Sequence, residues 1–288
     1  MQKYLNLSEY LKNEFGEKIQ KLPIDGGFLC PNRVNGNTGC LFCSDKGSGE
    51  FTEGGNSITE QIEIQKKLYS KNNGVNKFIA YFQSFSNTYG NVDELRRKYD
   101  EALSCEGIVG LAIATRPDCI NDDVLILLDE YNRKIFMWIE LGFQTSNENS
   151  TKLINRGYIN IIFDDCVKKL NGIGMKTVVH VIFGLPYESG KDFINTIKYI
   201  CDKNLWGIKF HSLYIQYNSP MYEYYKQYPF HIISKDEYTD SVAESIRILD
   251  NKLIIHRLTG DCKKDLLYEP KWSLDKLSVI SQINKKLR

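Results

Sequence analysis

The chain has 288 residues, of which 42% are hydrophobic and 25% are charged. These proportions are typical of a globular protein and exclude the collagen-like, low-complexity and disordered classes. With 37 basic and 36 acidic residues, the formal net charge is only +1, which argues against a dedicated DNA-binding module.

The sequence contains no apolar segment typical of a membrane protein. It has no run of about 18 uncharged apolar residues, and charges interrupt residues 1–18, where a signal peptide would have its apolar core. We therefore expect a cytoplasmic protein without a membrane partner. In that compartment the eight cysteines favour metal or redox chemistry over a disulfide framework.

The first part of the chain predicts two helices, one strand and a long loop. Residues 8–16 are expected to form a helix with Ser8 as its cap, and residues 19–24 a strand. A loop over residues 28–56 follows, rich in glycine and asparagine, and then a helix at about 58–71.

The same order of strand and helix then repeats. The further predicted pairs lie at 77–83 and 92–103, 108–114 and 122–131, 135–141 and about 147–172, and 176–184 and 189–203. A last predicted strand at 206–215 is followed by two helices, near 220–228 and 235–250. Strands that alternate with helices pair in parallel through right-handed crossovers. The pattern predicts an α/β protein, but periodicity alone does not separate a doubly wound sheet from a barrel. In both, functional residues lie at the carboxyl ends of the strands.

Residues 251–288 are expected to form an extension packed on a main domain of residues 1–250. The extension contains a predicted strand at 252–258, a loop, and an amphipathic helix capped by Ser273. Its nine basic residues outnumber its four acidic ones. A basic helix face of this kind is either solvated or contacts phosphate groups.

Cys30, Cys40 and Cys43 are clustered in the loop that follows the first predicted strand. Neighbours such as Asn35 and Gly36 let this loop curl tightly. Three interpretations are open: three unrelated buried thiols, a structural zinc site with a distant fourth ligand, or a 4Fe–4S cluster with one iron left open. An open coordination position is typical of a catalytic metal centre.

With the strands and helices behind it, this loop resembles that of the radical S-adenosylmethionine (radical SAM) superfamily. In that family three cysteines bind a 4Fe–4S cluster, and S-adenosylmethionine binds the fourth iron. Its cleavage makes a 5′-deoxyadenosyl radical that abstracts hydrogen from the substrate. The resemblance implies a partial (βα)6 barrel similar to a TIM barrel. The long gap between the first two cysteines is similar to that of the catalytic subunit of elongator, a tRNA-modifying enzyme.

Further motifs narrow the resemblance to a bacterial group. TRPD at 115–118, ELGFQTS at 140–146 and HVIFGLP at 180–186, with CPNR, INRG and HRLTGD, occur in the same order in elongator-like proteins of the YhcC, YtqA and MnmL kind. The match runs from residue 4 to about residue 281. It implies an enzyme that trims 5-carboxymethylaminomethyluridine at the wobble position of tRNA to 5-aminomethyluridine. It also implies an electron donor of the flavodoxin or ferredoxin type and a partner methyltransferase.

The resemblance also implies roles for individual residues. Cys30, Cys40 and Cys43 would each bind one iron. The other cofactor-binding residues would be Phe42 at the adenine, Ser84 at the methionine amino group, Gln144 and Arg156 at the ribose and the methionine carboxylate, and His180 where some relatives have an acid. Two alternatives to the tRNA enzyme stay open: a radical SAM enzyme with a small-molecule or protein substrate, and a non-catalytic iron–sulfur or zinc-binding module.

The catalytic residues are not identified, but candidates follow the predicted strands: Arg116, Asp118, His180, His211 and Tyr214. Each could instead be a polar core residue with a satisfied partner, and Arg116 and Asp118 could form a structural ion pair. The polar segment 256–261 either closes the barrel or positions the substrate. The tyrosines between residues 217 and 228 either stack on RNA bases or pack between helices.

Overall fold

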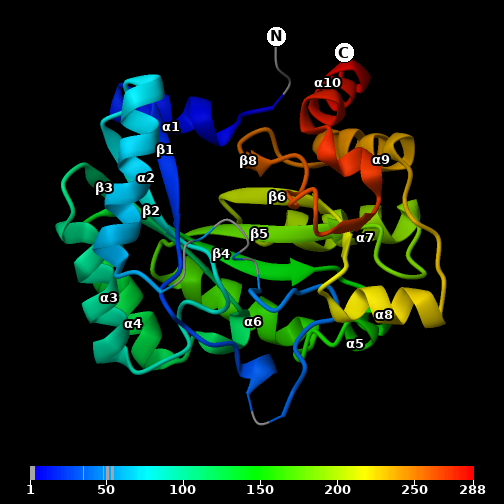
Figure 1. Ribbon diagram of the computed structural model, residues 1–288, viewed down its shortest axis with the longest axis horizontal. Helices are drawn as coiled ribbons and strands as arrows, with labels where there is room; N and C mark the ends of the chain where they lie inside the picture. Colours follow the sequence, from blue (N-terminus) through cyan, green and yellow to red (C-terminus); the bar gives the residue numbers. More distant parts are fainter. Residues whose placement is uncertain (1–3, 35, 48, 50–51, 53–54) are drawn as a thin grey trace.

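Figure 1 shows the computed structural model, in which a curved sheet is flanked by helices. The structure describes residues 4–34, 36–47, 49, 52 and 55–288. Asn35 of the cysteine loop lies outside the described residues. No helix in the described part of the chain has the length and apolar character needed to cross a membrane.

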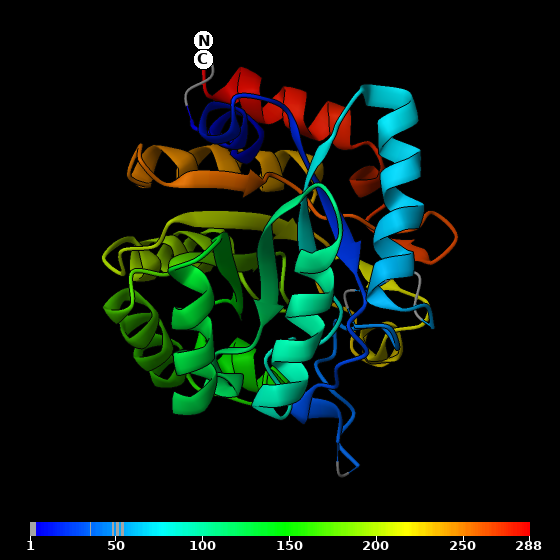
Figure 2. The same ribbon diagram turned by 90° about the vertical axis from the view of Figure 1, so that its left-hand side faces the viewer.

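The main sheet has seven strands within the described residues. They are β1 (Ile19–Ile24), β2 (Lys77–Phe82), β3 (Ile108–Thr115), β4 (Phe136–Gln144), β5 (Lys176–Phe183), β6 (Gly207–Ser212) and β8 (Ile254–Arg257). Each pairs in parallel with the one before it. Because the strand order never reverses, the sheet has no switch point of the doubly wound kind. It curls into a partial barrel (Figure 2), which confirms the predicted fold class.

Helices connect the strands and cover the outer face of the sheet. The α-helices are α1 (Leu7–Phe15), α2 (Ile58–Asn73), α3 (Val92–Ser104), α4 (Asp122–Asn132), α5 (Glu148–Leu153), α6 (Asn160–Gly172), α7 (Gly190–Cys201), α8 (Pro220–Gln227), α9 (Lys235–Ile248) and α10 (Lys276–Lys286). Short 3-10 helices lie at η1 (Pro31–Arg33), η2 (Pro117–Cys119) and η3 (Lys271–Leu274). A small antiparallel pair joins β7 (Ile215–Gln216) to β9 (Leu267–Glu269).

The C-terminal part of the chain differs most from the prediction. The strand expected over 206–215 ends at Ser212, and the chain resumes as β7. The strand expected at 252–258 is β8, which pairs with β6 and becomes the seventh strand of the barrel. The extension therefore supplies part of the sheet, and six strands were expected where seven are present. The division of the chain at residue 250 remains a prediction.

Two predicted helix caps are wrong. Asn6, not Ser8, caps α1, because its side chain accepts a hydrogen bond from the Glu9 amide at 2.9 Å. Asp275, not Ser273, caps α10 and accepts from the Ser278 amide at 3.1 Å. A capping oxygen must reach an N–H two or three residues further along the chain. Ser8 lies inside α1, and Ser273 lies inside η3.

Alternation along the strands separates the barrel interior from the core beneath the helices. The outward side chains form the large apolar core under the helices. The first inward layer is apolar and packs against α1; it includes Ile79, Trp138 and Val178. The next inward layer, two residues along each strand, is polar: Tyr81, Glu140 and His180. Helix α1 thus closes the amino end of the barrel, and the polar layer faces the carboxyl end.

Candidate active site

A cavity of about 490 Å³ opens at the carboxyl ends of the strands. Its lining combines the cysteine loop with the polar layer of the barrel. Most of the residues expected at a site line it: Cys30, Cys40, Phe42, Cys43, Arg116, Gln144, Arg156, His180, His211 and Tyr214. Asp118 and Ser84 are absent from this lining. The fold thus brings together residues that are up to 184 positions apart in the sequence.

The cysteine loop is folded around the side chain of Arg33. The Arg33 guanidinium donates to the carbonyl oxygens of Cys43 and Ser44 at 3.2 and 2.6 Å. Gly39 has φ +82°, and a Cβ atom there would lie 2.7 Å from Arg33 Nε. Only glycine fits both the left-handed backbone and this close approach. The loop conformation that presents the cysteines is therefore set by Arg33 and Gly39.

A second set of contacts ties the loop to the connection between α5 and α6. The Asn32 side-chain amide donates to the Asn155 carbonyl at 2.6 Å, and the Asn155 amide donates to the Gly39 carbonyl at 2.7 Å. The same Asn32 amide lies 3.4 Å from Cys40 Sγ. Asn155 has φ +53°, a conformation that asparagine tolerates better than most residues. These contacts hold Cys40 from the opposite side of the cavity.

The thiols are chemically unequal. A hydrogen bond with Cys43 lowers the pKa of Cys40 to about 7 against the effect of burial, with the charges of Arg116 and Arg33 and the Asn32 amide acting in the same direction. The same hydrogen bond and burial raise the pKa of Cys43. Of these two thiols, Cys40 therefore becomes a thiolate more readily, and the thiolate is the form that binds metal.

Gln144 projects into the cavity from an irregularity in β4. Its φ is +65°, and the register with β5 shifts between Gly142 and Gln144. The Gln144 side chain folds back over Gly142, where a Cβ atom would lie 2.7 Å from Gln144 Nε2. Its Oε1 is buried without a hydrogen-bond partner in the described part of the chain. A strained backbone and an unpaired buried acceptor are typical of a position kept for a ligand.

Arg156 is 1% exposed and is held mainly by the protein itself. It donates to the carbonyls of Phe143, Thr145 and Tyr158 at 2.8, 3.1 and 3.0 Å. It also donates to Asn160 Oδ1 at 2.8 Å. Four of the five guanidinium N–H groups are therefore occupied. This differs from the bidentate pairing with the methionine carboxylate that the resemblance implies, and a cofactor role for Arg156 remains a prediction.

Arg116 and Asp118 form the structural ion pair that was one of the two alternatives. Arg116 Nε and Nη2 lie 2.9 and 2.7 Å from the two oxygens of Asp118. Arg116 Nη1 donates to the Arg156 carbonyl at 2.8 Å. This arrangement fixes the Arg116 charge beside Cys40. A direct contact of either residue with substrate remains a prediction.

Ser84 faces the loop rather than the cavity. Its hydroxyl lies 3.1 Å from Thr52 Oγ1 in a buried contact. The neighbouring Ser86 does line the cavity, and its hydroxyl has no hydrogen-bond partner among the residues that the structure describes. Ser86 is therefore better placed than Ser84 to contact the cofactor.

Glu140 begins the ELGFQTS motif but is not among the site residues expected from the sequence. Its side chain is fully buried. Oε2 accepts from Tyr81 at 2.8 Å and from Lys209, and lies 2.9 Å from His180 Nε2. Oε1 accepts from Trp138 at 2.8 Å. A charged residue in the middle of an apolar strand is the signal that could have identified Glu140, Lys209 and Lys21.

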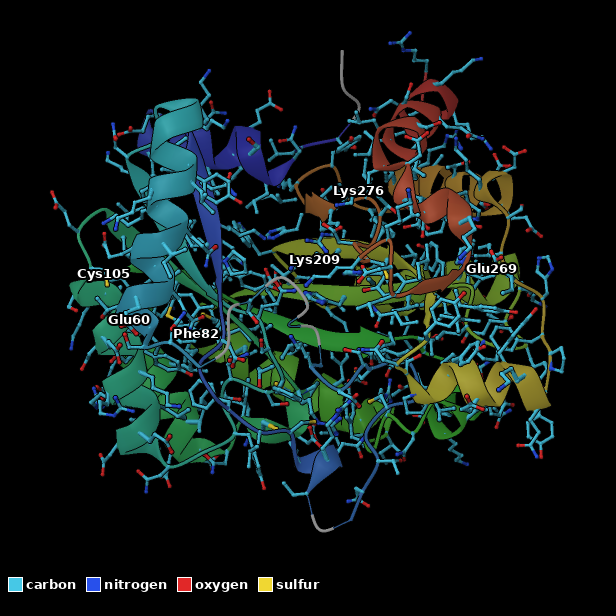
Figure 3. The ribbon with its side chains drawn as sticks, in the orientation of Figure 1. Glu60, Phe82, Cys105, Lys209, Glu269 and Lys276 are labelled. Carbon is cyan, nitrogen blue, oxygen red and sulfur yellow. The ribbon has the colours of Figure 1, made fainter. Side chains whose placement is uncertain are left out.

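Electrostatics fix the protonation of this layer. Burial acts to raise the pKa of Glu140, but the charges of Lys209 and Lys21 and the hydrogen bond with His180 hold it well below its usual value. Burial and the charge of Lys209 lower the pKa of His180 to about 4 despite Glu140. His180 is therefore a neutral imidazole near neutral pH. Figure 3 places Lys209 near the centre of the molecule.

The donor set fits a 4Fe–4S cluster with S-adenosylmethionine. Thiolates are the usual ligands of such clusters, and the unpaired Gln144 Oε1 and Ser86 hydroxyl offer polar contacts to a second group in the same cavity. Within the described residues, no group of three or more His, Cys, Asp or Glu side chains is arranged around a single-ion position. An iron–sulfur cluster does not need its ligands to surround a single point, since each thiolate binds a different iron.

Comparisons with known proteins give the same assignment. The family model of the radical SAM superfamily matches residues 30–200, and the radical SAM C-terminal domain matches residues 205–288. YtqA of Bacillus subtilis is 39% identical over 99% of this chain and 89% of its own length.

Two less similar proteins also match the chain. The solved structure of Elp3 from the archaeon Methanocaldococcus infernus has a TM-score of 0.69 and 17% identity, covering 81% of this chain and 60% of that chain. A tRNA-2-methylthio-N(6)-dimethylallyladenosine synthase of Fusobacterium nucleatum is 26% identical over 40% of this chain and 27% of its own length.

Proposed function

Because the chain belongs to the radical SAM superfamily, we propose that it is a tRNA-modifying member of it. The proposed reaction removes the carboxymethyl group from 5-carboxymethylaminomethyluridine at the wobble position. Abstraction of a hydrogen atom from the carbon between the amine and the carboxylate, and return of one electron to the cluster, would leave an imine; water would hydrolyse it to glyoxylate and 5-aminomethyluridine. The proposal carries three further elements: a cytoplasmic location, an electron donor of the flavodoxin or ferredoxin type, and a methyltransferase that uses the product.

The family's cofactors are a 4Fe–4S cluster and S-adenosylmethionine, which together supply a radical able to abstract hydrogen from an unactivated carbon. In this chain Cys30, Cys40 and Cys43 would hold the cluster. Phe42, Ser86 and Gln144 would contact S-adenosylmethionine. The polar layer around Glu140 would position the substrate against them.

The observation that carries the proposal is the shape of the site. One cavity joins the cysteine loop at its rim to a rigid, buried polar layer inside the barrel. A radical enzyme needs its substrate held close to the cofactor and shielded from solvent. The side chain of a modified uridine that enters this cavity would lie close to the cofactor and be shielded from solvent. Enzymes that modify bases commonly turn the target nucleotide out of the stack and into such a pocket.

Exposed aromatic side chains beside α8 support an RNA substrate. The α8 segment adjoins the cysteine loop, because the Met221 amide donates to the Leu41 carbonyl at 2.8 Å. Tyr187, Tyr217 and Tyr228 are 66%, 50% and 50% exposed. Tyr222 and Tyr225 pack against Tyr268 with ring centroids 5.0 and 5.9 Å apart, so the packing interpretation accounts for those two. Tyr217 also packs edge-on against Tyr222 and Tyr268, and Tyr187 and Tyr228 each contact one other aromatic ring. Half or more of each of these three side chains is still exposed and offers ring surface for stacking on unpaired bases.

The test is an anaerobic assay of the reconstituted enzyme with dithionite and S-adenosylmethionine. We expect bulk tRNA from a strain that lacks this gene to raise the yield of 5′-deoxyadenosine several-fold, and nucleoside mass analysis to find 5-aminomethyluridine. Bulk tRNA from the parent strain and the Cys40→Ala variant are the controls.

Two results would contradict the proposal. Equal yields of 5′-deoxyadenosine with and without tRNA would support the radical chemistry but contradict a tRNA substrate. The substrate would then be a small molecule or a protein. No 5′-deoxyadenosine from a protein with an intact cluster would favour the non-catalytic module.

A further inference from the structure

The polar segment 256–261 places an arginine inside the barrel. Arg257 ends β8 and is the register partner of Lys209 on β6, so both side chains project to the same side of the sheet. Arg257 lines the cavity. In the described part of the chain its guanidinium has no hydrogen bond and no ion pair. An arginine with all five donors unused is uncommon inside a protein cavity, because its charge is costly to desolvate without a partner.

A second cation faces the same space from the opposite edge of the sheet. Lys21 lies on β1, the first strand, while Arg257 lies on β8, the last. The N-terminal segment joins these edges, since the Ile255 amide donates to the Leu5 carbonyl at 2.8 Å. Lys21 also lines the cavity. The two edge strands of the open barrel thus bring two positive charges to one interior space.

The single buried carboxylate of this layer does not neutralise both charges. Glu140 is in contact with Lys209, and its nearest approach to Lys21 is 3.8 Å. Lys209 is the nearer partner of Glu140, so neither Lys21 nor Arg257 has a carboxylate at hydrogen-bond distance in the described part of the chain. Asp261, at the edge of the cavity, is paired with Lys276. Burial and the charge of Arg257 lower the pKa of Lys21 although Glu140 acts to raise it, a repulsion that a bound anion would relieve.

A neutral donor completes the arrangement. His211 lies on β6, two residues beyond Lys209, and lines the cavity. Its Nε2 atom is buried and has no hydrogen-bond partner among the described residues. Its ring centroid lies 5.5 Å from that of His180. Because buried polar groups normally have hydrogen-bond partners, the His211 nitrogen and the Arg257 guanidinium indicate a ligand that supplies these partners.

We propose that Arg257, His211 and Lys21 form a receptor for a carboxylate group carried by the substrate. The planar guanidinium matches a carboxylate in two parallel hydrogen bonds. This inference rests on the proposed function and deepens it, because the carboxylate removed with the carboxymethyl group would be the part of the substrate that the receptor selects. Arg33 and Arg116 act on the cysteine thiols, whereas Arg257 acts on Lys21, His180 and His211. Arg257 therefore acts on the polar layer of the barrel, where it is the register partner of Lys209.

The first test uses a ligand pair without RNA. N-benzylglycine carries a carboxylate on a methylamino arm attached to a ring, and N-benzylglycinamide is its neutral match. Titration calorimetry of the reconstituted protein with S-adenosylmethionine should show the acid binding about tenfold or more tightly than the amide. Arg257→Gln should reduce that ratio to about threefold or less, and Arg257→Lys should retain part of it. Lys252 is an exposed cation just before β8 and does not line the cavity, so Lys252→Gln should retain the full acid-to-amide ratio.

The second test distinguishes a substrate receptor from a cofactor-binding role of Arg257. Arg257→Gln should bind S-adenosylmethionine as the parent does; loss of cofactor binding with an unchanged acid-to-amide ratio would mean that the arginine serves the methionine carboxylate, and would overturn the proposal. Equal binding of acid and amide by the parent protein would also overturn it.

A third measurement tells the failure of this inference from the failure of the proposed function. An anticodon stem–loop with 5-carboxymethylaminomethyluridine should bind more tightly than one with the corresponding amide. If Arg257 makes the protein bind N-benzylglycine more tightly than its amide, but the acid and amide stem–loops bind equally, the carboxylate receptor is supported and the tRNA substrate is contradicted.

Discussion

At the scale of the residue, the site is defined by a few side chains whose partners are fixed. Glu140 engages Tyr81, Trp138 and Lys209 through both of its oxygens. Cys40 is approached by the Asn32 amide at 3.4 Å. Such contacts determine protonation and orientation before any ligand binds. Among the described residues that line the cavity, Ser86, Gln144 and His211 each keep a buried polar atom without a partner and are available to ligands.

Replacement of Cys40 by alanine tests the cluster assignment. The Cys40→Ala variant should lose most of its iron and its charge-transfer absorption after reconstitution, because two thiolates hold a cluster poorly. Cys166→Ala removes a buried thiol on α6 that does not line the cavity, and it should keep the parent's iron content. Iron and sulfide analysis of both variants checks this prediction. Equal iron content in the two would contradict it.

His180 makes stability depend on pH. Its folded pKa of about 4 lies below the ordinary value of 6.5, so the unfolded chain binds more protons between these values. The stability is therefore full above about pH 6.5 and is lost as the pH falls towards 4. Between about pH 7 and pH 5 the loss should be about 2 kcal/mol.

The His180→Gln variant should show a pH dependence smaller by that amount. Urea unfolding at the two pH values measures it for parent and variant. The acidic window of Glu140 lies below its ordinary pKa of 4.5 and does not interfere. An identical pH slope in the two proteins would mean that His180 is not the group that titrates.

At the scale of the element, the cysteine loop depends on the backbone of one glycine. Gly39 and Gly36 both have φ +82°, but only Gly39 lies against another side chain, that of Arg33. Strand β4 depends on a second local irregularity, the shift at Gly142 that turns Gln144 into the cavity. In both elements a departure from regular geometry places a ligand-directed group.

Alanine at the two loop glycines separates backbone strain from a steric clash. Gly36→Ala should cost about 1–2 kcal/mol through strain alone. Gly39→Ala adds a Cβ atom 2.7 Å from Arg33 Nε and should displace the loop. The rate of iron loss to a chelator should be much faster for Gly39→Ala than for Gly36→Ala. Equal rates would show that Arg33 moves aside without consequence.

At the scale of the whole molecule, the C-terminal segment completes the barrel. It supplies β8, and α10 packs on α9 through Val279 and Ile283, both fully buried. Figure 1 shows α10 and the N-terminal segment at the same end of the molecule. The first and last parts of the chain meet where Leu5 pairs with Ile255. These contacts predict that residues 251–288 unfold together with the rest.

A pair of variants on α10 tests this cooperativity. Ile283→Ala should lower the free energy of unfolding by about 2–5 kcal/mol in one transition for the whole chain. Leu277→Ala, at a position 82% exposed, should change it by less than about 0.5 kcal/mol. Denaturant unfolding followed by far-ultraviolet circular dichroism measures both. A separate early transition for Ile283→Ala would show that the extension is an independent unit.

The sequence by itself determined the strand and helix order, because each element carries its own periodicity and its own turn residues. The spacing of the three cysteines predicted a metal site, since that spacing is local, and the family resemblance predicted Gln144; all four residues line the cavity. The sequence did not identify β8 as part of the barrel, because the sequence pattern of a short apolar strand does not show which sheet the strand joins.

Only the tertiary structure decided which polar residues meet. Tyr81, Glu140 and Lys209 come from three strands and face one another only after the sheet curls. The same closure brings Arg257 and Lys21 to one cavity, where Arg257 has no hydrogen-bond partner among the residues that the structure describes. Burial, the energy of an ion pair and the absence of a partner are properties of the folded arrangement, so no pattern along the chain expresses them.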